Sequence, residues 1–138
     1  MKYLHDHPWL TIITAEIAAD KLAAPVADSH PNWEYIDSQI LKLGTLSHQQ
    51  LDIKEIQQQA LSLLESETKD MRVLSHLLRT LQHNGNSAEL FLAFVLFSHY
   101  IQLYWQTAYP PVKLKARLAL QIIKRFNNEK LLNNDSVK

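Results

Sequence analysis

Histidine side chains give this chain its clearest capacity for metal or acid–base chemistry. The sequence of 138 residues contains seven of them, and neutral imidazole is the commonest metal ligand in proteins. His76 and His83 are seven residues apart, which places both on one face of a helix. A catalytic zinc site needs three protein ligands, and no carboxylate stands at helical spacing beside either histidine. A metal-dependent hydrolase whose carboxylates come from elsewhere in the fold is therefore the alternative hypothesis.

The other candidate groups do not complete a known catalytic pattern. His5 and His7 flank Asp6, and Tyr104 and Trp105 follow one another near a Pro-Pro pair. The chain has no cysteine, no glycine-rich phosphate loop, no Gly-x-Ser-x-Gly and no His-Glu-x-x-His. We therefore predict no catalytic, cofactor or metal site, and half-buried or surface histidines. The aromatic pair suits a core or interface anchor, and the Trp105 ring N–H is expected to bond a free carbonyl at a helix end.

The segment from Thr68 to Val73 carries two positive charges where a helix is expected to begin. Thr68 is expected to cap a helix, with Asp70 in its first turn, where negative charge is favourable. Lys69 and Arg72 oppose the helix dipole there by about 0.3–1 kcal/mol when exposed. Two interpretations of Arg72 stay open: a carboxylate elsewhere in the fold holds it, or it is an exposed arginine.

A basic segment without any acidic residue lies between Val112 and Asn128. Its charged residues are Lys113, Lys115, Arg117, Lys124 and Arg125. A solvated outer face explains them, and an anionic groove on a partner protein would also suit them, with Lys113 and Arg117 facing the partner. Binding to nucleic acid is disfavoured, because fourteen basic residues are balanced by fourteen acidic ones in the whole chain.

Composition and length predict one soluble domain. Hydrophobic residues make up 46% of the chain, an ordinary share for a globular protein. The start of the chain is polar where an export signal would be apolar. The longest apolar run, Leu90 to Phe97, is too short to cross a bilayer, so no membrane insertion is expected.

Periodic apolar residues predict an all-α fold, an antiparallel bundle of about five main helices. A loosely structured lead-in, residues 1–31, is expected to pack on the bundle, with Pro8, Pro25 and Pro31 as breaks and a short helix near Ile12 to Leu22. The helical domain spans 32–128, and a polar tail or linker follows at 129–138. The first expected helix begins near Trp33, and the second runs from Asp52 to Ser66. The third runs from Thr68 to a left-handed cap at Asn84-Gly85. The fourth runs from an N-cap at Ser87 to Thr107, and the fifth from Val112 to Asn127. A polar connection covers Gly44 to Gln50. Inward positions are expected at Trp33, Ile36, Ile40, Leu43, Ile53, Ile56, Ala60, Leu63, Leu64, Met71, Leu74, Leu77, Leu78, Leu81, Leu114, Leu118, Ile122 and Phe126.

The fourth of these helices is apolar on every side between Leu90 and Phe97. Such a helix is normally surrounded by protein, which predicts the centre of the bundle. The alternative leaves one flank, with Phe91, Leu92 and Val95, exposed to a partner.

Two segments are similar to the signatures of one protein family. Lys69-Asp70-Met71-Arg72-Val73 is similar to Lys-Asp-Leu-Arg-Val, and Tyr104-Trp105-Gln106-Thr107-Ala108-Tyr109-Pro110 is similar to Tyr-Trp-Asp-x-x-His-Pro. Through these motifs the chain resembles the ImpA-related N-terminal domain of TssA-like type VI secretion proteins. The segment from Ala60 to Leu64 and the opening helix from Trp33 also resemble the family. Gln106 and Tyr109 depart from the family's Asp and His, and Ile53 stands where a Trp is common.

The resemblance implies a non-enzymatic scaffold domain. It would dock onto baseplate, tail tube or contractile sheath components during assembly, in the cytoplasm of a Gram-negative bacterium. It also implies that a C-terminal region outside this sequence makes the full-length protein homo-oligomeric, so residues 1–138 are expected to be monomeric or weakly dimeric. Lys69, Asp70, Arg72, Tyr104, Trp105 and Pro110 would be structural motif residues.

Overall fold

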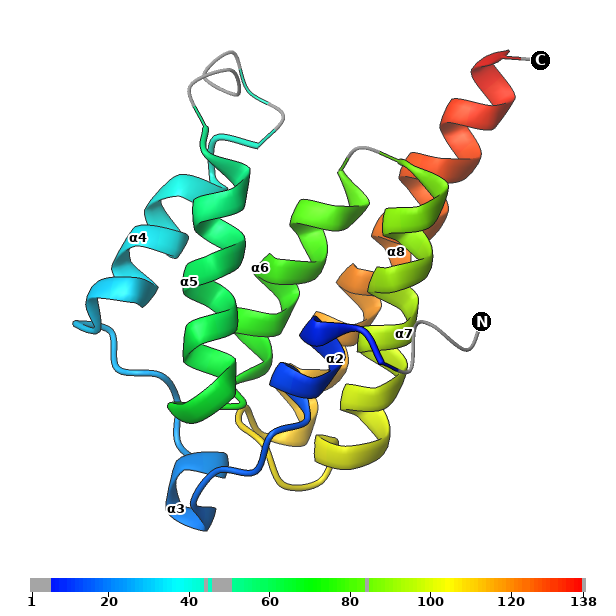
Figure 1. Cartoon of the computed structure of the whole chain (residues 1–138). Coiled ribbons are helices and arrows are strands. Elements are labelled where there is room, and N and C mark those ends of the chain that lie inside the picture. Colours follow the sequence, from blue (N-terminus) through cyan, green and yellow to red (C-terminus); the bar gives the residue numbers. More distant parts are fainter. Residues whose placement is uncertain (1–5, 44, 46–50, 84, 138) are drawn as a thin grey trace.

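The computed structural model describes residues 6–43, 45, 51–83 and 85–137, and for residues 128–137 it describes the backbone alone. Every regular element in those ranges is a helix, which confirms the all-α prediction. The helices are α2 Pro8–Ile13, α3 Ala19–Leu22, α4 Pro31–Ile40, α5 Ile53–Ser66, α6 Met71–Gln82, α7 Ser87–Tyr104 and α8 Val112–Val137 (Figure 1). Within these residues, none of the helices combines the length and apolar character needed to cross a membrane.

Helix α6 is the centre of the bundle. It packs against α4, α5, α7 and α8, while α2 lies against α5 and α7 (Figure 1). Nine of its twelve residues are buried, among them the polar Ser75, Thr80 and Gln82. The prediction that α7 would be central was wrong, because α7 is covered on one side only and leaves Phe94 56% exposed.

The core forms where the apolar faces of these helices meet. Trp33, Ile36, Ile40 and Leu43 of the first predicted face are all buried, as expected, and so are Leu74, Leu77 and Leu78 of α6. In α8, Ile122 is buried, but Leu114 is 39% exposed and was wrongly predicted to point inward. Lys115 takes the inward position at this end of α8, and successive helical residues point about 100° apart, so Leu114 turns outward.

Two helices begin at residues other than the predicted ones. Asp70, and not Thr68, is the N-cap of α6, and Asn86, and not Ser87, is the N-cap of α7. The Asn86 side chain accepts hydrogen bonds from the backbone N–H groups of Ala88 and Glu89. In both cases an Asx side chain satisfies the free N–H groups of the first turn.

The ends of α6, α7 and α8 agree with the sequence prediction in one case and differ from it in two. Gly85 has a φ of 69°, which confirms the predicted left-handed turn after α6. Helix α7 ends at Tyr104, three residues before the predicted Thr107. Helix α8 continues to Val137, so its predicted end at Asn127 was wrong. No glycine or proline occurs after Pro111, so the sequence holds no strong helix breaker in this region.

The lead-in forms two short helices in place of the one predicted. Pro8 is the first residue of α2, where its missing N–H is harmless, and is not a break. Leu10, Ile13 and Val26 are buried in the core, which anchors the segment at three points. His5 and most of the connection from Gly44 to Gln50 lie outside the described residues.

Candidate functional site

Lys69 is fully buried, and its ammonium group binds backbone carbonyls. Nζ lies 2.9 Å from the carbonyl oxygen of Ile13 and 3.4 Å from that of Ile12, and it also donates to the carbonyl of Leu64. Ile12 and Ile13 end α2, and Leu64 lies in the last turn of α5. The ammonium therefore serves the negative ends of two helices at once, where free carbonyls need donors. Burial lowers the pKa of Lys69 to about 8, and the charge of Glu65 opposes that shift.

Asp70 is also fully buried and uses both carboxylate oxygens. Oδ1 accepts the backbone N–H of Arg72 at 2.9 Å, and Oδ2 accepts the backbone N–H of Val26 at 3.0 Å. The Arg72 guanidinium binds the same carboxylate, with Nη2 2.7 Å from Oδ2 and Nε 3.1 Å from Oδ1. This two-pronged, charge-assisted contact is a strong one. It also raises the pKa of Arg72, an effect that desolvation opposes.

Arg72 is therefore held by a carboxylate, as one of the two interpretations expected, but that carboxylate lies in its own segment. The expectation of a carboxylate elsewhere in the bundle was wrong. Asp70 is the N-cap of α6, two residues before Arg72, and its carboxylate binds the guanidinium from there. The guanidinium also lies 5.0 Å from the ring centre of Trp33 and 5.3 Å from that of Tyr109. These are cation–π distances.

The two family-like segments meet in the structure. The Met71 N–H donates to the Tyr109 carbonyl at 2.9 Å, and the Tyr109 N–H donates to the Leu22 carbonyl at 3.1 Å. The Tyr100 hydroxyl donates to the Lys69 carbonyl at 2.7 Å, and the Tyr104 ring centre lies 5.4 Å from the Lys69 ammonium. Pro110 is buried directly after Tyr109, across a cis peptide bond. Residues 69–73 and 104–110 thus form one internal cluster with the lead-in.

Lys115 repeats the arrangement of Lys69 at the end of α7. It is buried, its ammonium donates to the Trp105 carbonyl, and it lies 5.6 Å from the centre of the Trp105 ring. Burial lowers the pKa of Lys115. The expectation that Lys115 belongs to a solvated face was wrong. Trp105 is half-buried, and its own carbonyl at this helix end accepts from the Lys115 ammonium, not from a tryptophan ring N–H of the kind that was expected to serve the helix end.

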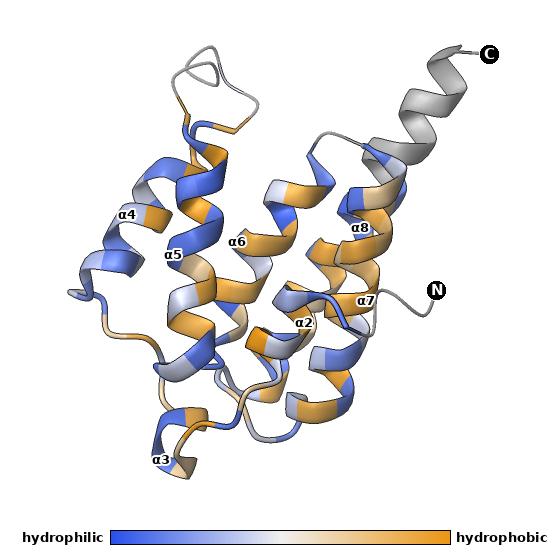
Figure 2. Cartoon of the chain, in the orientation of Figure 1, coloured by the Kyte–Doolittle hydropathy of each residue, from blue (hydrophilic) through white to orange (hydrophobic). Residues whose placement is uncertain are grey.

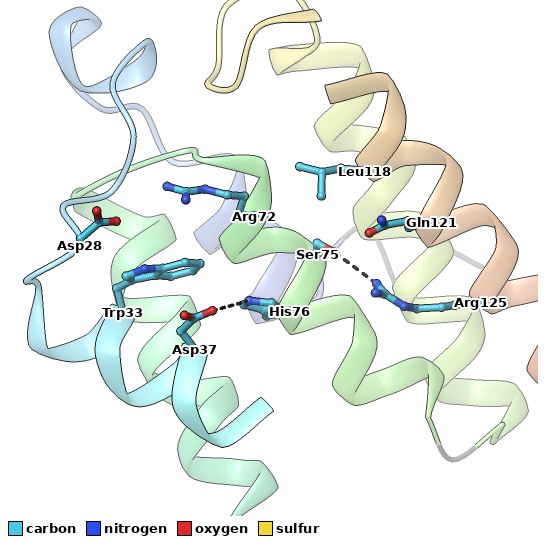
Figure 3. A pocket seen from close by; sticks show the side chains of 9 residues that line it. All are labelled: Asp28, Trp33, Asp37, Arg72, Ser75, His76, Leu118, Gln121 and Arg125. Atoms are coloured by element: carbon cyan, nitrogen blue, oxygen red, sulfur yellow. Dashed lines mark hydrogen bonds and ion pairs between the residues drawn. The ribbon is translucent and has the colours of Figure 1, made fainter. Parts of the chain in front are cut away.

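A cleft of about 340 Å³ opens beside Arg72, between α4, α6 and α8 (Figure 3). Its lining combines the rings of a tryptophan and a histidine, both signs of charge, a hydroxyl, an amide and a leucine. The residues are Asp28, Trp33, Asp37, Arg72, Ser75, His76, Leu118, Gln121 and Arg125. Arg125 crosses from α8 to α6, with Nη1 3.2 Å from the Ser75 hydroxyl.

His76 is one wall of the cleft. Its ring stacks on Trp33, with centroids 5.5 Å apart, and Nε2 lies 3.6 Å from Oδ1 of Asp37. Burial lowers the pKa of His76 to about 4, although Asp37 acts to raise it. The imidazole is therefore neutral at pH 7. His83 does not line the cleft, and no three His, Cys, Asp or Glu side chains converge among the described residues.

The predicted partner-facing residues divide between two surfaces. In α7, Phe91 and Val95 are half-buried, but Leu92 is buried and was wrongly assigned, because it points into the core cluster. In α8, Lys113 and Arg117 are exposed and line a shallow hollow, together with Tyr109, Pro111 and Leu114.

Sequence reasoning missed one exposed aromatic residue and the grouping of the residues that line the cleft. The main exposed apolar residue of α7 is Phe94, which the continuous apolar run conceals. Asp28, Asp37, Ser75, Leu118 and Gln121 reach the cleft from a loop and three helices. No spacing in the sequence signals such a group.

Comparison with known families gives one match. A family model described as ImpA, N-terminal, type VI secretion system, matches residues 14–128. No curated protein and no solved structure matches the chain. The matched range includes both segments of the internal cluster and every residue that lines the cleft.

Proposed function

The chain belongs to the ImpA N-terminal family of the type VI secretion system, since the match covers more than half of its residues, and we propose that it is a non-enzymatic docking domain of that apparatus. It acts within a TssA-like component in the cytoplasm of a Gram-negative bacterium. It holds baseplate, tail tube or sheath components during assembly. A region outside this sequence makes the full-length protein homo-oligomeric.

One observation carries this proposal: the charged groups of the motif are engaged inside the domain. Lys69 and Asp70 are fully buried, and Arg72 is bound by Asp70 and lies at cation–π distance from the rings of Trp33 and Tyr109. A side chain bound in this way is poorly placed to attack a substrate or to transfer a proton. The motif therefore supports a structural role, and the surface around it is left to make contacts.

The cleft suits a segment of protein. Arginine and tryptophan are the residue types that contribute most to binding energy at interfaces, and Arg72, Arg125 and Trp33 line this cleft. Asp28 and Asp37 add acceptors for basic or amide groups of a partner. Its volume of about 340 Å³ lies at the lower end of the range for ligand pockets, which fits a few side chains of a docked segment.

The proposal is tested with purified components of one secretion system. Residues 1–138 are immobilised, and baseplate, tube and sheath proteins from the same bacterium are titrated over them by interferometry. We expect saturable binding to one of these proteins and none to a protein from outside the system. Absence of binding to every component, with the domain shown to be folded by circular dichroism, would overturn the proposal.

A further inference from the structure

Charge is distributed unevenly in this neutral chain. The stretch from Leu90 to Asn128, which includes most of α7 and the first part of α8, contains five basic residues and no acidic residue. The rest of the chain holds the other nine basic residues and all fourteen acidic ones. One part of the molecule is therefore positive and the remainder negative, although the formal net charge is zero.

Exposed apolar side chains gather on the same two helices. Phe94 of α7 is 56% exposed, and Leu120 and Ile123 of α8 are 57% and 43% exposed. The Phe94 ring meets the ring of half-buried Phe126 edge to face, with centroids 6.2 Å apart. Phe126, Ile123 and Leu120 are successive i±3 neighbours on α8, so the four residues form a continuous row. Hydrophobic colours cover much of α7 and part of α8 in Figure 2.

Basic side chains border this row. Arg117 and Lys124 are exposed one turn before and one turn after Leu120. We define the α7–α8 face as the apolar row Phe94, Leu120, Ile123 and Phe126 with Arg117 and Lys124 beside it. A partner that covers this face must supply apolar groups for the row and negative charge for its border.

We infer that the α7–α8 face binds an amphipathic helix of a partner protein whose apolar stripe is flanked by acidic residues. Such a helix would lie along the apolar row and place its carboxylates against Arg117 and Lys124, because an amphipathic helix binds a partner through apolar anchors at i, i+3, i+4 and i+7. This goes beyond the proposed function, because it uses a different surface from the cleft and would stand if the cleft bound nothing.

Other occupants fit the face less well. A symmetric dimer would place the same basic border against itself, since a two-fold interface joins identical patches. A head-to-tail copy would offer acidic surface, but among the described residues outside α7 and α8 the only large apolar residue that is exposed is Leu41. A membrane-bound helix sinks a broad apolar side into lipid, whereas Ile122 and Leu118 of α8 already pack against the core.

The test uses synthetic helices and fluorescence anisotropy. One labelled peptide of about 18 residues carries a leucine stripe flanked by glutamates, and a second has lysines in place of the glutamates. We expect the acidic peptide to bind residues 1–138 at least about tenfold more tightly than the basic one, a difference that shrinks in high salt. Equal binding of both peptides, or no binding of either, would overturn the inference.

Variants locate the binding surface. Leu120→Ser with Ile123→Ser should weaken the acidic peptide about tenfold, whereas Leu41→Ser, an exposed leucine on another surface, should not. Arg117→Glu with Lys124→Glu should exchange the preference in favour of the basic peptide. Melting curves verify that each variant is folded. Unchanged preference in the charge-reversed variant contradicts the assignment.

Two further measurements separate the competing occupants. Light scattering of wild-type residues 1–138 that shows a dimer, lost in Leu120→Ser, would assign the face to a second copy. Sedimentation with anionic phosphatidylserine vesicles that retains the domain, while the acidic peptide does not bind, would assign it to lipid. Either result overturns the inference, and both leave the cleft proposal untouched.

Discussion

The ammonium nitrogen of Lys69 lies 2.9 Å from the carbonyl oxygen of Ile13, the last residue of α2. This contact joins residues 56 positions apart in the sequence. The lysine of the family-like motif thereby fastens the lead-in to the bundle. Asp70 makes a second tie by accepting the N–H of Val26, so the motif connects the lead-in at two places.

Lys69→Met should destabilise the domain by about 2–4 kcal/mol, because it leaves several buried carbonyls without a donor while preserving the length of the side chain. Urea denaturation followed by circular dichroism measures the change. Lys54→Met, at an exposed position of α5, is the matched control and should have little effect.

The same variant should loosen the lead-in. Limited proteolysis is expected to cleave near residues 14–18, between α2 and α3, faster in Lys69→Met than in the wild type. A variant with wild-type stability and wild-type cleavage would show that Lys69 does not tie α2 to the bundle.

Arg72→Ala should cost about 2–4 kcal/mol, because the buried Asp70 carboxylate loses its charged partner. A thermal melt measures this, with Arg117→Ala as an exposed arginine for comparison. If the two alanine variants melted at the same temperature, the contact with Asp70 would contribute no more than a surface charge.

Acid should destabilise the fold through His76. Burial lowers its folded-state pKa to about 4, against about 6.5 in an unfolded chain. Between these values the unfolded state binds more protons, so stability rises with pH and falls on acidification. From pH 7 to pH 5, the wild type should lose about 1–2 kcal/mol more than His76→Phe, which keeps an aromatic ring against Trp33 and does not titrate. Identical pH profiles of the two proteins would contradict this shift.

Trp105→Ala should cost about 1–3 kcal/mol, less than truncation of a fully buried tryptophan, because Trp105 is half-buried. Part of the loss comes from the ammonium of Lys115, which lies over the ring. Circular dichroism should show a cooperative melt at a lower temperature. A melt at the wild-type temperature would remove Trp105 from the structural cluster.

Regular apolar spacing made the helices predictable. The faces of α4 and α6 follow from residues three and four apart, and Gly85 marks a turn that needs a positive φ. Helix α7 misled the prediction because an unbroken apolar run has no periodicity that separates its buried side from Phe94. Periodicity therefore identified α7 as a helix but gave no information on which side is covered.

The candidate site was less predictable, because its contacts join distant parts of the chain. Charge type alone suggested that Lys115 is solvated, and only packing shows its ammonium at the end of α7. The pairing of Arg72 with Asp70 depends on where α6 begins, and a shift of that N-cap from Thr68 to Asp70 changes the partner. The resemblance identified the motif as a unit, but the contacts of Lys69 with Ile13 and of Asp70 with Val26 can be seen only in the folded structure.

The most direct test of docking through the cleft is calorimetric titration of the secretion component that binds residues 1–138 into wild type, Gln121→Trp and Gln58→Trp. Gln121 lines the cleft, and Gln58 is exposed on α5, so the same substitution fills the cleft in one variant and leaves it open in the other. We predict that Gln121→Trp weakens binding at least about tenfold, a loss of about 1.4 kcal/mol, while Gln58→Trp binds as the wild type does. Equal affinities of all three proteins would contradict docking in the cleft.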